Sequence, residues 1–118
     1  MKFALITAVL LSSIGLVNVA NAANAEKGKA LVEKANCASC HGAGLNAPIL
    51  PAYPKLAGQH AAYIVKQLKD YKGAKDRPNA IMGAFAGLLS DEDMANLGAY
   101  LEKQTPGTGT AKNEASIE

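Results

Sequence analysis

Both cysteines of this 118-residue chain fall in one pentapeptide, Cys37-Ala38-Ser39-Cys40-His41. Two thiols three positions apart can add across the two vinyl groups on one edge of a porphyrin and form two thioethers. The next residue then lies under the ring, where the imidazole of His41 can bind the iron. This spacing is the attachment motif of haem c, and it predicts one covalently bound haem linked to Cys37 and Cys40.

Three other chemistries use the same residue types. A redox-active dithiol is expected after a buried strand in a βαβ unit, whereas helical periodicity precedes Cys37. A structural zinc ion needs four ligands, and beyond Cys37, Cys40 and His41 the supply of Cys and His ends with His60. A disulfide across two intervening residues closes a very short loop and stabilises a fold little. The sequence therefore favours haem attachment over all three.

The group opposite His41 decides what a haem iron does, because an open position allows ligand binding whereas methionine closes the iron and raises its potential. Met82 is expected in an irregular segment from which it can reach across the distal face. Met94 lies on the apolar face of the last predicted helix and is expected to fill the core. His60, a rival ligand, begins a helix beside Gln59 and is expected at the surface.

The composition is that of one small domain. The chain has 12 Lys and Arg against 10 Asp and Glu, a formal net charge of +2, which gives no indication of nucleic-acid binding. It has no Trp, 2 Phe and 4 Tyr, although aromatic side chains usually supply much of the buried area in a core. This deficit indicates that a bound cofactor supplies part of the core.

The N-terminus has the features of an export signal. Lys2 precedes an apolar run that extends to Val19, and small-residue triplets end at Ala22 and Ala25. We therefore expect residues 1–22 to be a cleaved signal peptide. An uncleaved membrane anchor is the alternative, but an anchor has no need of the Ala-x-Ala ending. Export predicts a soluble periplasmic protein without stable membrane insertion, the compartment in which bacteria attach haem c.

Hydrophobic periodicity predicts three main helices, at residues 25–35, 60–72 and 90–103. No alternating strand pattern is present, so the predicted fold is all-α. The stretches between the helices are rich in Gly and Pro, and residues 73–89 are expected to be irregular or only briefly helical. Residues 105–118 are polar and without periodicity, which predicts a disordered tail after a single domain of residues 23–104.

Capping residues mark the ends of these helices. Asn24 is a predicted N-cap of the first helix, and Gly73 is expected to end the second. Ser90 and Asp93 stand at capping-box spacing at the start of the third, although the box prefers Glu or Gln at its second position.

With these motifs in place, the chain resembles the class I c-type cytochromes, and in particular the bacterial periplasmic cytochromes of the c-four and c-five group. The resemblance extends over nearly the whole predicted mature chain, in residues 37–42, 54–59, 63–71, 82–85 and 90–101. It implies the cytochrome c fold, in which three main helices and Gly/Pro-rich loops surround one covalent haem. One motif in the chain implies the single-haem form rather than the tandem form.

The resemblance also implies roles for individual residues. It implies thioether links at Cys37 and Cys40 and iron ligands at His41 and Met82. Pro54 matches the family proline whose carbonyl accepts a hydrogen bond from the proximal imidazole and so orients it.

One further position is implied in the same way. Gly28 matches the small residue at which the first and last helices of the family cross, near Leu97 and Tyr100.

The implied function is one-electron transfer between redox partner proteins, such as an oxidase, a reductase or a dehydrogenase, by a monomer that is not itself an enzyme. Two alternatives stay open. One is a haem enzyme or gas sensor in which Met82 is labile. The other is a dedicated cytochrome subunit of a dehydrogenase complex.

A series of basic residues in the second predicted helix and just after it has two interpretations. Its members are Lys66, Lys69, Lys72, Lys75 and Arg77. The series could steer docking to an acidic partner. It could equally be a solvated helix face on which Lys66 pairs with Asp70, and the near-neutral net charge favours this second interpretation.

Overall fold

The computed structural model describes residues 22–106. The predicted tail beyond residue 106, and all but the last residue of the predicted signal peptide, lie outside the described residues. The helices are α1 (Ala25–Lys34), α2 (Ala38–His41), the short 3₁₀ helix η2 (Ala43–Leu45), α3 (Ala61–Gly73), α4 (Ala80–Gly87) and α5 (Asp91–Glu102). Residues 22–106 contain no strand, which confirms the all-α prediction.

No helix among the described residues has the length and apolar content needed to cross a membrane.

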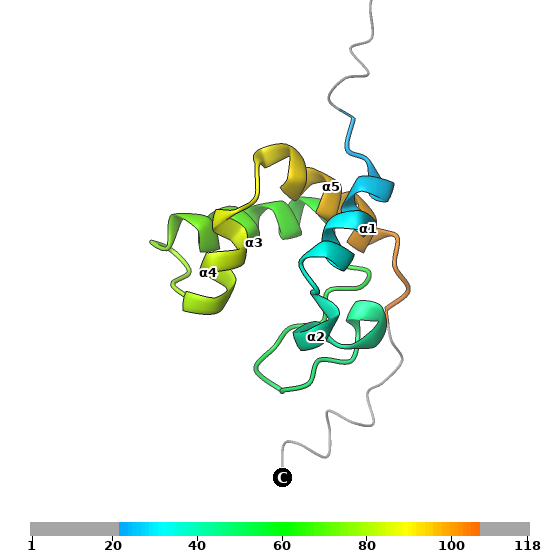
Figure 1. The fold of residues 1–118 in the computed structure, drawn as a ribbon, viewed down its shortest axis with the longest axis horizontal. Coiled ribbons are helices and arrows are strands. Elements are labelled where there is room, and N and C mark those ends of the chain that lie inside the picture. Colours follow the sequence, from blue (N-terminus) through cyan, green and yellow to red (C-terminus); the bar gives the residue numbers. More distant parts are fainter. Residues whose placement is uncertain (1–21, 107–118) are drawn as a thin grey trace, which may run out of the picture.

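Helices α1 and α5 cross at a glycine. They lie side by side in Figure 1, where the first and last helices of the fold meet. A Cβ atom placed on Gly28 would lie 2.1 Å from the carbonyl oxygen of Asn96 and 2.8 Å from the Cβ of Tyr100. Only glycine therefore allows this backbone approach, and the crossing position expected from the resemblance is confirmed.

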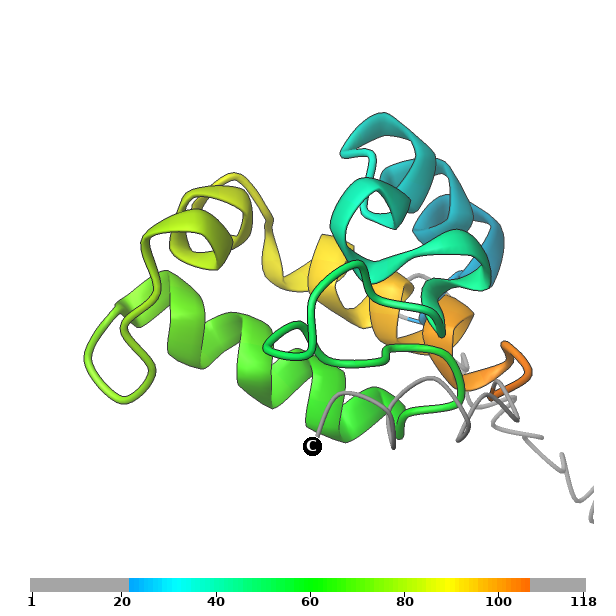
Figure 2. The ribbon, with the colours of Figure 1, turned by 90° about the horizontal axis from the view of Figure 1, so that it is seen from below.

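Helix α5 meets α3 at a second glycine that the sequence did not single out. A Cβ atom on Gly98 would lie 2.9 Å from the carbonyl oxygen of Ala61, the first residue of α3. Figure 2 shows α3 running beneath α5, with α1 and α2 on the other side of α5. Helix α5 is therefore the central element, and its neighbours approach it at backbone distance on two sides.

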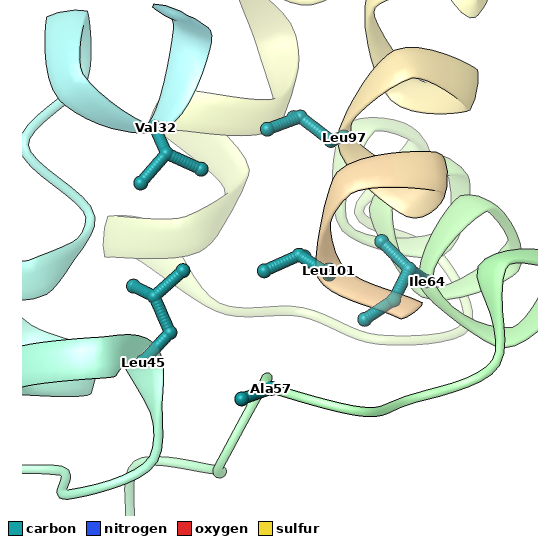
Figure 3. Packing of buried hydrophobic residues seen from close by; sticks show 6 residues of the cluster. All are labelled: Val32, Leu45, Ala57, Ile64, Leu97 and Leu101. Atoms are coloured by element: carbon teal, nitrogen blue, oxygen red, sulfur yellow. The ribbon is translucent and has the colours of Figure 1, made fainter. Parts of the chain in front are cut away.

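The buried core is small and consists of aliphatic side chains. Its main cluster draws on α1, η2, α3, α5 and the loop before α3, and contains Val32, Leu45, Ala57, Ile64, Leu97 and Leu101 (Figure 3). None of the described aromatic side chains is buried, and the one large side chain that is fully buried is that of Met94. The protein core is thus as poor in aromatic groups as the composition predicted.

Hydrogen bonds at the helix starts confirm two predicted caps. The side-chain oxygen of Asn24 accepts from the backbone N–H of Lys27 at 3.1 Å. Its own backbone N–H donates to the side-chain oxygen of the buried Asn96 at 2.8 Å, which ties the start of α1 to α5. At α5, Ser90 and Asp93 exchange two hydrogen bonds of 3.0 Å, so the capping box forms with Asp in place of Glu.

The end of α3 differs from the prediction. Gly73 is the last helical residue, and the left-handed position beyond it is taken by Ala74, with φ of 55°. A β-carbon is strained in this conformation, by roughly 1–2 kcal/mol. The N–H of Ala74 nevertheless bonds the carbonyls of Asp70 and Tyr71, which ends the helix one residue later than glycine preference suggests.

The segment before α5 contains a helix of two turns, which is the briefly helical alternative of the prediction. Asn79 caps α4 by accepting hydrogen bonds from the backbone N–H groups of Ile81 and Met82. A Cβ atom on Gly83 would lie 3.4 Å from the carbonyl oxygen of Tyr71, an ordinary van der Waals distance, so α4 packs on α3 without a need for glycine at this position.

A matched pair of glycine substitutions tests the crossing of α1 and α5. We expect Gly28→Ala to lower the free energy of unfolding by about 1–3 kcal/mol, because the added methyl group meets backbone atoms that cannot move aside. Gly73→Ala is the control, since no atom lies within 4 Å of its added Cβ. It should raise the free energy by about 0.5–1 kcal/mol. Denaturant unfolding of the purified holoprotein measures both, and equal effects would contradict the close-approach argument.

Candidate functional site

The Cys-Ala-Ser-Cys-His pentapeptide forms a single helical turn at the end of α1. Cys37 is the N-cap of α2, and its carbonyl accepts a hydrogen bond from the backbone N–H of His41 at 3.0 Å. The backbone N–H of Cys37 in turn donates a hydrogen bond of 3.1 Å to the carbonyl oxygen of Val32 in α1. In a helical turn, positions three apart lie on the same side. The two half-buried thiols and the imidazole therefore come from one short, anchored element.

The imidazole of His41 is buried and held by a backbone carbonyl. Its side chain is 6% exposed, and Nδ1 lies 2.8 Å from the carbonyl oxygen of Pro54. Because a carbonyl only accepts, Nδ1 carries the proton and donates it to this bond. The other nitrogen, Nε2, then has a free lone pair and can bind a metal. The structure thus brings together His41 and Pro54, as the family resemblance implies.

The loop from α2 to α3 folds back on α2 and so presents the Pro54 carbonyl. Gly42 has φ of 82°, and a Cβ atom there would lie 1.7 Å from the carbonyl oxygen of Ala47. Leu45 is buried in the core cluster despite a φ of 59°, and its carbonyl accepts hydrogen bonds from the backbone N–H groups of Leu56 and Ala57. The sequence did not indicate that Leu45 anchors this loop, because it stands alone in a Gly-rich stretch.

The two thiols are half-buried, and no disulfide joins them. Burial raises the pKa of the Cys37 thiol, a hydrogen bond to backbone opposes the rise, and the neighbouring Cys40 adds to it.

The metal alternative lacks ligands in this part of the chain. Within residues 22–106, no three His, Cys, Asp or Glu side chains gather closely enough to hold a metal ion. A haem iron makes a smaller demand, because the porphyrin supplies four nitrogens and the protein needs to supply only the axial ligands.

Met82 lies in the first turn of α4 rather than in an irregular loop. Its backbone N–H donates to the side-chain oxygen of Asn79 at 2.9 Å, and its side chain is half-buried. The expectation of a swinging loop residue is therefore wrong, because this segment is a helix capped by Asn79. Asn immediately before a run of helix formers is a recognised start signal, and it could have revealed this helix.

The two rival residues lie elsewhere. Met94 is completely buried in α5, at 0% exposure, as expected for a core side chain. His60 precedes α3 with a side chain that is 90% exposed, and its Nδ1 lies 3.8 Å from a carboxylate oxygen of Glu102 at the end of α5. The surface position expected for His60 is confirmed.

Most of the basic series is engaged within the protein. Lys66 donates to Asp70 at 2.6 Å, Lys69 lies 3.9 Å from Asp91, and Lys72 donates to the carbonyl oxygen of Leu89 at 2.5 Å. The hydrogen bond to Asp70 raises the pKa of the Lys66 amine. The predicted Lys66–Asp70 pair is therefore confirmed.

The surface around these elements carries apolar side chains that a large apolar group would cover. The exposed large hydrophobic residues within 22–106 are Ile49, Leu50, Tyr63, Ile81, Phe85 and Leu88. Four of the six belong to the loop that carries Pro54 or to the helix that carries Met82. Together with free thiols, a ring nitrogen available for a metal and a core without aromatic groups, they fit a covalently attached haem.

Comparison with known proteins agrees with this geometry. The cytochrome c family profile matches residues 25–105. Cytochrome c4 of Pseudomonas aeruginosa is 41% identical over 103 residues, which are 86% of this chain and 49% of that protein. A thiosulfate dehydrogenase electron acceptor of Stutzerimonas stutzeri is 44% identical over 66 residues, 56% of this chain and 30% of that protein.

A solved structure gives the same result for the fold. Reduced recombinant cytochrome c4 from Pseudomonas stutzeri superposes with a TM-score of 0.61 at 32% identity, and the match covers 69% of this chain and 48% of that one. The chain thus spans about half the length of the cytochrome c4 proteins that it matches. On the profile match, the identity and the shared structure, the chain belongs to the cytochrome c family, whose domain carries covalently bound haem c.

Proposed function

We propose that this protein is a periplasmic one-electron carrier with a single haem c. Cys37 and Cys40 form the thioether links, and His41 and Met82 are the two axial ligands. When bound, the haem supplies reversible exchange of one electron between the ferrous and ferric states. The chain contributes the attachment, the orientation of the ligands and the apolar surroundings.

The observation that carries this proposal is the hydrogen bond from His41 Nδ1 to the Pro54 carbonyl oxygen, at 2.8 Å. The bond sets the tautomer that leaves Nε2 available, and it fixes the plane of the ring. A ligand held in one orientation needs little rearrangement when the charge of the metal changes. Burial of the ring in a chain segment bearing two thiols supports the same role.

The choice of Met82 as the second ligand rests on where the alternatives lie. Met94 is enclosed by the core, and moving it outward would leave a cavity there. His60 is exposed at the opposite end of α3 from α4. Met82 is half-buried, at the start of a helix whose exposed face is apolar. Met and His ligands together leave no open position, which favours electron transfer over gas binding or enzymatic chemistry.

The partners of this carrier are proposed to be redox proteins, with a dehydrogenase among them. The support is the similarity to proteins named thiosulfate dehydrogenase electron acceptor, from two bacteria. Three lysines of the basic series, Lys66, Lys69 and Lys72, have partners within the chain, so the series gives little support to a docking surface for an acidic partner.

A redox titration tests the proposal as a whole. We expect the purified holoprotein to have the mass of the mature chain plus one haem and to titrate as a single one-electron couple. The reduced protein should not bind carbon monoxide readily, because Met82 occupies the position opposite His41. Ready carbon monoxide binding, or a second haem in the mass spectrum, would overturn the proposal.

Substitution of the two methionines tests the ligand assignment. Met82→Ala should keep the covalent haem but lose the far-red sulfur-to-iron charge-transfer band of the oxidised protein, become high-spin and shift to a lower potential. Met94→Leu is the matched control, because a buried Met replaced by Leu of similar volume costs less than about 1.5 kcal/mol. Loss of the band in the Met94 variant alone would assign the ligand to Met94.

The start of the mature chain is the fourth testable point. Asn24 caps α1 and bonds Asn96 of α5, so cleavage after Ala25 would remove a cap that stabilises a helix by about 1 kcal/mol. We propose cleavage after Ala22. Intact mass and N-terminal sequencing of the periplasmic fraction should give a chain beginning at Ala23, and a start at Glu26 would contradict the proposal.

A further inference from the structure

We propose that Arg77 is a positioning residue for Met82. Its guanidinium clamps the connection between α3 and α4 onto α3, and so controls how firmly the methionine is held opposite His41. This inference rests on the proposed ligation by Met82.

Helix α4 depends on α3 for its place in the fold. Among the described helices it packs chiefly against α3, and Figures 1 and 2 both show it beside the end of α3 that is remote from α1 and α2. Its eight residues, Ala80–Gly87, include no charged side chain and no polar one. Any side-chain hydrogen bond or charged contact that fixes α4 must therefore come from the residues that flank it.

At the far end of α4, the attachment is a lysine of α3. Lys72 donates from its amine to the carbonyl oxygen of Leu89 at 2.5 Å. In the middle, Gly83 lies next to the backbone of Tyr71, and a Cβ atom on it would be 3.4 Å from the Tyr71 carbonyl oxygen. Neither contact holds the first turn, which bears Met82.

At the near end, Arg77 makes two contacts with α3. Its Nη1 donates a hydrogen bond to the side-chain oxygen of Gln67. Its guanidinium carbon lies 4.8 Å from the centroid of the Tyr71 ring, which is a cation–π contact. The planar guanidinium suits both contacts at once, since it donates in its plane and stacks on its face.

Only a short, stiff stretch of chain separates this clamp from Met82. Pro78 follows Arg77 directly and restricts the backbone on both sides of it. Asn79 comes next and bonds the backbone N–H of Met82 itself at 2.9 Å. A displacement of Arg77 is therefore passed to the first turn of α4 rather than absorbed by a flexible linker.

Loss of the Arg77 contacts should change the relative populations of two forms of the site and leave the fold unchanged. The methionine-bound form exists in equilibrium with a form in which Met82 has left, and only the second form can accept an added ligand. The apparent affinity for that ligand falls in proportion to the fraction of protein that is competent to bind it. A contact that favours the methionine-bound form thus weakens binding of any competing ligand by the same factor.

Imidazole titration of the oxidised holoprotein measures this equilibrium. Imidazole replaces the sulfur of Met82 without changing the oxidation state, and the far-red band disappears as it binds. We expect Arg77→Ala to bind imidazole about tenfold more tightly than the unmodified protein. Lys75→Ala is the matched control, because it removes the same charge from the same exposed connection. Its affinity should stay within about twofold of the unmodified protein.

Gln67→Leu is the second variant, and it removes the other partner of the hydrogen bond in case Arg77→Ala does not accumulate. We expect its affinity for imidazole to rise about threefold, because the contact of Arg77 with Tyr71 remains. In the double variant the two effects should be less than additive, as for residues in direct contact. Arg77→Lys should have an imidazole affinity between those of Arg77→Ala and the unmodified protein, because lysine keeps the charge but loses the planar group.

Two outcomes separate this inference from the proposed function. If the unmodified protein lacks the far-red band, the Met82 assignment fails and the clamp fails with it. If the band is present but neither Arg77→Ala nor Gln67→Leu binds imidazole more tightly, the clamp alone is overturned. Equal effects from Lys75→Ala and Arg77→Ala would likewise overturn it, because they would assign the change to charge.

Discussion

The hydrogen bond between the His41 ring and the Pro54 carbonyl governs both the chemistry of the site and the path of the chain around it. Donation from Nδ1 leaves Nε2 as the nitrogen that can bind a metal. To bring that carbonyl within 2.8 Å, the loop after α2 must reverse over the helix it has just left. Gly42 permits the first turn of this reversal. The carbonyl of Leu45 then accepts hydrogen bonds from the backbone N–H groups of Leu56 and Ala57 on the returning part of the loop. Leu45 also enters the core, so the loop is anchored to the fold by a buried side chain.

The small size of the protein core explains why the helices approach so closely. Gly28 and Gly98 let α1 and α3 meet α5 at backbone distance, and the cluster that they enclose holds no aromatic side chain. Close crossing compensates for small side chains, because dispersion contacts depend on distance. Helix α4 stands outside the main cluster and carries exposed apolar groups on its surface. In a cytochrome c domain the covalent haem supplies the large apolar body that such a protein leaves out.

Four cations of α3 and of the connection that follows it serve internal attachment. Lys66 and Lys69 pair with carboxylates, Lys72 bonds the chain beyond α4, and Arg77 contacts α3 from the chain before α4. Cations therefore tie the chain on both sides of α4 to α3. An electron carrier gains from such a scaffold, because ligands that move little on oxidation and reduction allow the electron to move with little rearrangement.

Local features of this protein could be predicted from its sequence, because their causes lie within a few residues. The spacing of Cys37, Cys40 and His41 determines what can be attached, and the caps at Asn24 and Ser90 bond the turn that follows them. Other features have causes that lie far apart in the chain. The place of the helix that bears Met82 depends on its packing against α3, and Leu45 enters a core built from three other helices. Only the tertiary structure brings these partners together, because close packing depends on the folded path of the whole chain rather than on any local pattern.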